Sequence, residues 1–166
     1  MTATYEKIAT NTLGSAAANV EFTSITGSYT DLILVINGGF SANGAMVVRV
    51  NSDTGSNFST TLINGDGSSA ISFRSSNTAG KIYMNYNAIT GNSFSGVWLI
   101  NFQNYANTTT YKTILGRYNG ASNEVGASVG LWRSTSAINT IRVFENGGAN
   151  LLSGSTFTLY GILKEA

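Results

Sequence analysis

The chain has 166 residues, with nine Lys and Arg against eight Asp and Glu, for a formal net charge of +1. His, Cys and Pro are absent, which excludes a Ser-His-Asp triad and the usual zinc, haem and iron–sulfur ligand sets. The near-neutral charge provides no electrostatic footprint for nucleic acid or an anionic membrane surface. We therefore expect no cofactor, no nucleic-acid partner and no membrane partner.

Hydrophobic residues make up 42% of the chain and aromatic residues 11%, spread throughout it. A chain of this size can bury roughly 70% of its surface, so we expect one folded domain over residues 1–166. The longest aliphatic run, Leu32–Ile36, is far shorter than the ~20 residues of a membrane-spanning helix. The first residues, Met1–Leu13, contain no apolar stretch of signal-peptide length, which predicts a protein made in the cytoplasm.

Short segments rich in β-branched and aromatic residues follow one another along the chain, as is typical of strands. The clearest are Val20–Ile25, Leu32–Asn37, Met46–Val50, Lys81–Asn87, Val97–Gln103, Lys112–Tyr118, Val125–Arg133, Ile138–Phe144 and Phe157–Leu163. Weaker candidates are Tyr5–Thr10, Thr61–Asn64 and Ile71–Arg74. Leu32–Ile36 and Val97–Ile100 are apolar on both faces, as in strands covered on both sides. Only Thr54–Ile63 lacks clean alternation, which allows a short helix there.

Turn signals favour the same fold class. Asn-Gly, a dipeptide suited to type I′ hairpin turns, occurs at residues 37–38, 43–44, 64–65, 119–120 and 146–147. Without Pro, the chain lacks one device that protects sheet edges, so we expect the edges to be covered in an oligomer. The sequence thus predicts an all-β protein, an antiparallel two-sheet sandwich of jelly-roll-like topology with little or no helix.

Any catalysis must rest on carboxylates. The acids are Glu6, Glu21, Asp31, Asp53, Asp66, Glu124, Glu145 and Glu165. A glycosidase needs only two facing carboxylates, but no pair lies in a recognisable motif. We therefore expect a non-enzymatic protein with no catalytic residues.

Two oxygen-rich turns, Asp53–Gly55 and Asn64–Gly67, contain residue types that bind Ca²⁺. Neither has the regular ligand spacing of an EF-hand loop. Asp and Asn beside Gly commonly accept hydrogen bonds from their own backbone. The sequence favours such turns over a metal site, although it leaves calcium binding open.

The larger aromatic residues divide into two groups. Trp98 and Trp132 lie in predicted strands, and large aromatic side chains dominate sandwich cores. Tyr105, Tyr111 and Tyr118 lie near turns and Thr runs, where we expect them to be exposed and available to a protein or glycan partner.

Four stretches carry a family resemblance: Tyr5–Ala16, Asp53–Ser59, Gly130–Ile138 and Thr158–Ile162. With these residues in this order, the chain resembles small β-sandwich proteins found among virion structural genes of tailed bacteriophages and in prophages. Gly130-Leu131-Trp132-Arg133-Ser134 is the most distinctive part. The resemblance implies a virion component and supplies no catalytic motif.

Fibre tips usually follow a shaft or an attachment domain, and none lies between Met1 and Ala166. We therefore expect a capsid decoration (cement) protein that binds the major capsid protein, with a homotrimer favoured by analogy to capsid symmetry. The alternative is a tail-fibre or baseplate module that binds a host receptor or glycan. The partner-binding residues are unknown from sequence, and the polar stretches Asn51–Thr61 and Ser75–Lys81 are candidate contact loops.

Overall fold

The computed structural model describes residues 4–85, 96–121 and 124–163. These residues form twelve strands, namely β1 (Tyr5–Thr12), β2 (Asn19–Phe22), β3 (Tyr29–Gly38), β4 (Met46–Val50), β5 (Phe58–Gly65), β6 (Ala70–Thr78), β7 (Ile82–Tyr83), β8 (Gly96–Phe102), β9 (Lys112–Gly120), β10 (Glu124–Trp132), β11 (Ile141–Glu145) and β12 (Thr156–Leu163). The described ranges include no helix, and so none that is long and apolar enough to cross a membrane.

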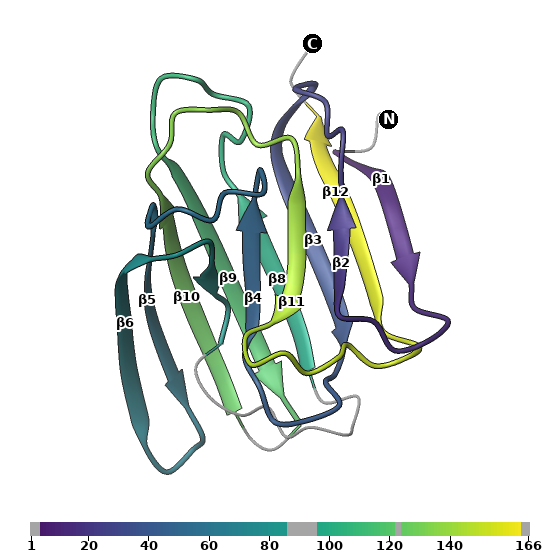
Figure 1. The fold of residues 1–166 in the computed structure, drawn as a ribbon, viewed down its shortest axis with the longest axis vertical. Coiled ribbons are helices and arrows are strands. Elements are labelled where there is room, and N and C mark those ends of the chain that lie inside the picture. The colour runs from purple at the N-terminus through teal and green to yellow at the C-terminus, as the bar shows by residue number, and fades with distance from the viewer. Residues whose placement is uncertain (1–3, 86–95, 122–123, 164–166) are drawn as a thin grey trace.

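The strands form two antiparallel sheets packed face to face (Figure 1). The large sheet has eight strands in the order β1-β12-β3-β8-β9-β10-β5-β6, and the small sheet has four in the order β2-β11-β4-β7. The pairing is nested, because the first strand pairs with the last and the second with the last but one. The predicted fold class, an antiparallel jelly-roll-like sandwich, is confirmed.

The core lies between the sheets and follows the period-two alternation of strands. In β3, Leu32, Leu34 and Ile36 are fully buried, and the residues between them face outward. Trp98, on the neighbouring β8, is also fully buried and its ring packs against that of Phe40, with the centroids 5.8 Å apart. Because the small sheet has half as many strands, it covers the middle of the large sheet and leaves the β5–β6 hairpin extending to one side (Figure 1).

Each of the twelve predicted strand segments overlaps an observed strand. The short helix allowed over Thr54–Ile63 is wrong, because Phe58–Gly65 forms β5 and pairs on both sides with neighbouring strands. The segment predicted as Lys81–Asn87 is a strand only over Ile82–Tyr83, and its residues 86 and 87 lie outside the described ranges.

The Asn-Gly prediction is also wrong. Type I′ turns need a positive φ at both central residues, and none of the Asn-Gly residues has one. Three of these dipeptides instead end strands, at residues 37–38, 64–65 and 119–120. The β5–β6 turn uses the next residues, where Gly67 has a φ of +86° and Asp66 Oδ1 accepts the N–H groups of Ser68 and Ser69.

Candidate interaction surface

The carboxylates of the described residues lie mostly in structural hydrogen bonds. Glu145 is buried and accepts the N–H groups of Gly147 at 2.6 Å and Ala149 at 2.8 Å, so it shapes the turn after β11. Asp31 Oδ1 accepts the N–H of Asn104 at 2.6 Å. Over the part of the chain that the structure describes, no three Asp or Glu residues gather into a group able to hold a metal ion. Glu165 lies outside that part.

Both oxygen-rich turns are Asx turns, as the sequence favoured. Asp53 Oδ1 accepts the N–H of Gly55 at 2.7 Å, and Asp66 closes the β5–β6 turn in the same way. The side-chain oxygens of these residues thereby satisfy local backbone donors.

The predicted locations of the aromatic residues are confirmed for three residues and wrong for two. Trp98 and Trp132 are core residues, at 0% and 2% exposure, and Tyr111 is 56% exposed. Tyr105 and Tyr118, expected at the surface, are 0% and 5% exposed.

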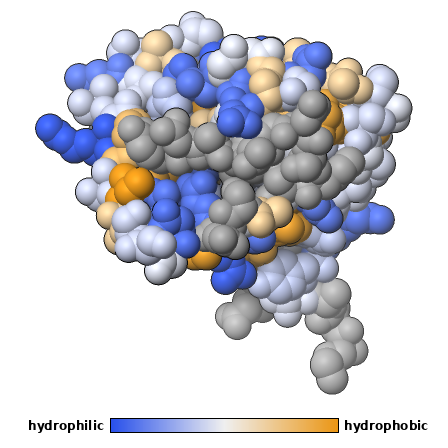
Figure 2. Space-filling model, turned by 90° about the horizontal axis from the view of Figure 1, so that it is seen from below, coloured by the Kyte–Doolittle hydropathy of each residue, from blue (hydrophilic) through white to orange (hydrophobic). Residues whose placement is uncertain are grey.

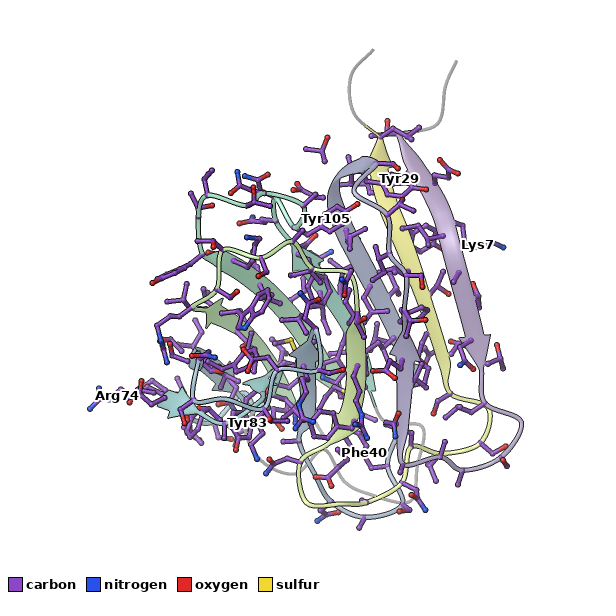
Figure 3. The ribbon with its side chains drawn as sticks, turned by 45° about the horizontal axis from the view of Figure 1, so that its top comes forward. Lys7, Tyr29, Phe40, Arg74, Tyr83 and Tyr105 are labelled. Carbon is purple, nitrogen blue, oxygen red and sulfur yellow. The ribbon has the colours of Figure 1, made fainter. Side chains whose placement is uncertain are left out.

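Each of these two buried tyrosines has a hydrogen-bond acceptor for its hydroxyl, which offsets the cost of burying it. Tyr105 Oη donates to the carbonyl of Thr26 and lies beside Tyr29 (Figure 3). Tyr118 Oη donates to Glu124 Oε1 at 2.5 Å. Neither tyrosine is available to an external partner.

The four stretches that carry the family resemblance contact one another in two pairs. Tyr5–Thr12 and Thr156–Leu163 are the neighbouring strands β1 and β12. Trp132 Nε1 donates to Asp53 Oδ2 at 2.7 Å, and Arg133 Nη1 donates to Ser59 Oγ at 2.8 Å. These stretches therefore form one edge of the large sheet and fix the segment before β5.

The two stretches named as candidate contact loops are partly strand, and their role as contacts stays a prediction. Arg133 Nη2 donates to the carbonyl of Ser56 at 2.9 Å and to Asn77 Oδ1 at 3.0 Å, which ties both segments to β10. Residues 58–61 belong to β5, where Phe58 and Thr60 are buried. Residues 75–78 belong to β6.

Asp53 is held as a carboxylate by this network. Burial opposes its ionisation, but hydrogen bonds from Trp132, Asn57 and Gly55, together with the positive charge of Arg49, outweigh burial. The pKa of the Asp53 carboxyl is therefore lowered from its ordinary value of 3.8.

Replacing Asp53 by alanine is expected to reduce the free energy of unfolding at pH 6 by about 1.5–3 kcal/mol, the usual worth of hydrogen bonds to a charged group. The folded pKa is depressed, so this contribution is fully present above pH 3.8 and is lost as the pH falls through the folded value. Urea unfolding of both proteins at pH 6 and at about pH 2.5 should show a smaller difference at the acidic pH. An equal difference at both would contradict the role of the ionised carboxylate.

An exposed apolar surface lies on the outer face of the large sheet. The residues of β8, β9, β10 and β5 that point away from the core fall into three rows across the strands. The rows are Val97-Asn119-Val125-Gly65, Leu99-Arg117-Ala127-Ile63 and Asn101-Leu115-Val129-Thr61. We call this set the aliphatic face.

The aliphatic face is exposed to solvent. Ile63 and Val125 are each 62% exposed, Val129 47%, Val97 41% and Leu115 37%. At ordinary strand spacing and rise, its Cα atoms span roughly 14 Å in each direction. Apolar patches on the order of 300–600 Å² are often functional in monomeric proteins.

Three adjacent hollows lie in the aliphatic face. One of about 360 Å³ lies around Val125 and Ile63, where Gly65, Ala70 and Ala127 leave room. The second, about 360 Å³, and the third, about 420 Å³, share Leu99 and Arg117 in their linings. Such hollows suit apolar side chains delivered by a partner surface.

Arg117 is the single charged residue in the rows of the aliphatic face. It is exposed, and it has neither a hydrogen-bond nor an ion-pair partner within the described ranges. A guanidinium without a partner among the described residues, amid aliphatic side chains, would suit a carboxylate or a carbonyl oxygen at this point.

Other parts of the surface differ from this face. Figure 2 shows the lower end of the sandwich, where the described residues are mostly hydrophilic, with scattered hydrophobic ones. Lys7 on β1 and Arg74 on β6 lie towards opposite edges of the large sheet (Figure 3). From the sequence, a segment that is apolar on both faces, such as Val97–Ile100, was expected to be covered on both sides. The exposed aliphatic face was therefore not predicted.

Comparison with known proteins gives no family assignment. No family model and no curated protein matches the chain. Among solved structures, it is similar to the galectin LEC-6 of Caenorhabditis elegans, at 9% identity and a TM-score of 0.37, covering 90% of this chain and 94% of that one. It is also similar to a toad ovary galectin in complex with thio-digalactose, at 9% identity and a TM-score of 0.41, covering 87% and 99%. Both scores are low, so neither galectin informs the function or the sites of this chain.

Proposed function

We propose that the protein is a non-enzymatic structural component of a tailed-phage virion, made in the host cytoplasm. More specifically, we propose a capsid decoration protein that binds the major capsid protein through the aliphatic face and acts as a homotrimer. The observation that carries the proposal is the exposed aliphatic face with its three hollows. A protein–protein contact surface of this kind fits a role in assembly.

The resemblance to virion proteins gives the proposal its biological setting. The stretches behind that resemblance serve the fold, through the β1–β12 pair and the Asp53–Trp132 hydrogen bond. A family defined by such residues has a common fold and no common catalytic residues, which is consistent with a structural role.

The mechanism requires only binding. A shell under internal pressure fails where neighbouring capsid subunits separate, and a protein bound across them must be released before they part. Its binding free energy therefore adds to the stability of the assembled shell. Three linked copies raise the avidity further, provided that their geometry allows simultaneous contact.

The test is the location of the protein in purified virions of the phage that carries the gene. We expect an antibody to this chain to label the shell at many symmetry-related positions. Labelling confined to the tail or baseplate would favour the alternative of a receptor- or glycan-binding module. Absence from the particle would contradict both roles.

A further inference from the structure

The outer face of the small sheet carries two arginines side by side. Strands β11 and β4 pair antiparallel with Arg142 opposite Arg49, while Ile141 and Val143 point into the core. Like charges directly opposite one another on neighbouring strands are unfavourable. Some other interaction must therefore offset the repulsion between the two guanidinium groups.

One aromatic ring accommodates both cations. The Arg49 guanidinium carbon lies 5.0 Å from the centroid of the Phe144 ring, and that of Arg142 lies 5.5 Å from it. Nearby, Lys81 Nζ lies 5.7 Å from the centroid of Tyr83, which is paired with Val47 of β4. The result is a partly exposed surface of cations stacked on aromatic rings, which we call the arginine pair face.

No carboxylate within the described ranges forms an ion pair with either arginine. Glu21 is opposite Arg142 in register, on β2, but does not reach it. Arg49 Nε donates to the carbonyl of Gly80 at 2.6 Å, whereas Arg142 Nε is buried without an acceptor. Asp53 influences Arg49 only at longer range.

The electrostatics of Arg49 agree with this geometry. Burial and then the positive charge of Arg142 lower the pKa of the Arg49 guanidinium, with Asp53 opposing them. Each arginine keeps N–H donors in a planar fork, the arrangement that matches the two oxygens of a carboxylate.

We propose that Arg49 and Arg142 form a binding site for the carboxylate groups of an acidic segment of a partner protein. Both arginines are partly exposed on the outer face of a sheet, which suits carboxylates carried on a large surface. A protein is favoured over a nucleic acid because the chain has a net charge of only +1, whereas phosphate backbones are bound by many cations. Arginines and aromatic residues are also the side chains enriched in protein interfaces.

This site is independent of the proposed function, since it belongs to the other sheet from the aliphatic face. A particle protein with both surfaces has an apolar contact on one side and a charge-dependent contact on the other. The second contact weakens with salt, because partly exposed charges are screened.

A hexaglutamate peptide titrated into the purified, isotopically labelled chain tests the proposal. We expect the Nε–H signals of Arg49 and Arg142 to shift together, and the effect to weaken as NaCl is added. Arg142→Gln should reduce the affinity by about fivefold, the size expected for one partly exposed charge pair. Arg142→Lys should recover part of it, because lysine keeps the charge and loses the fork.

The matched control is Arg74→Gln on the exposed edge strand β6, where we expect less than about a twofold change. An equal loss in Arg74→Gln would overturn the site, because binding would then follow total charge. A twelve-residue oligothymidylate that binds more tightly than the peptide at the same salt would also overturn it, in favour of nucleic acid. A dispersed amide spectrum for each variant shows that the sandwich is intact.

Discussion

Replacing Trp98 by alanine is expected to reduce the free energy of unfolding by about 3–5 kcal/mol, the range for deleting a buried aromatic ring. Trp98 is fully buried, in the middle of the large sheet, and packs against Phe40. Its removal leaves a cavity that the paired strands β3 and β9 on either side cannot close. Urea unfolding followed by circular dichroism measures the loss.

The neighbouring residue provides the control. Val97 lies on the same strand but points outward and is 41% exposed. Val97→Ala is expected to change the free energy of unfolding by less than about 0.5 kcal/mol, as surface substitutions usually do. Similar losses for the two variants would mean that β8 does not present alternate residues to the core.

The strands and the fold class were predictable because they depend on local patterns. β-branched residues are frequent in both β3 and β11, and burial alternates along each strand. In β3 the sequence predicts the strand but not which face is the more buried, because Ile33 and Val35 are as apolar as their buried neighbours.

The turns were less predictable because several solutions compete for the same residues. Asn64 and Gly65 have the chemistry of a tight turn, yet they extend β5, since Asp66 and Gly67 provide a turn two residues later. Asp66 satisfies two backbone donors with one side-chain oxygen. That arrangement becomes evident only when the register of β5 and β6 is known.

The surfaces were not predictable because they depend on how many strands each sheet contains. Composition does not reveal that one sheet has eight strands and the other four. It therefore does not reveal which apolar strand face is left without a second sheet packed against it. Tyr105 and Tyr118 looked like surface residues for a similar reason. Their acceptors, the carbonyl of Thr26 and the carboxylate of Glu124, come from other parts of the chain.

The central claim is that the aliphatic face binds the virion shell, and two isoleucines of one hairpin test it. Ile63 on β5 lies in the aliphatic face and is 62% exposed, whereas Ile71 on β6 points to the opposite side and is 45% exposed. Aspartate at either position should reduce stability by a similar amount, about 1 kcal/mol, because both are exposed strand positions where isoleucine is favoured over aspartate. Only Ile63→Asp places a charge in an apolar contact, so it should cost binding at least about 2 kcal/mol, or roughly thirtyfold in affinity.

The measurement is co-sedimentation of each purified protein with capsids from a phage whose copy of the gene has been deleted. We expect the original protein and Ile71→Asp to bind the capsids with similar affinity and Ile63→Asp to be lost from the pellet. Equal binding by all three proteins would contradict the assignment of the aliphatic face. No binding by the original protein would contradict the decoration role itself.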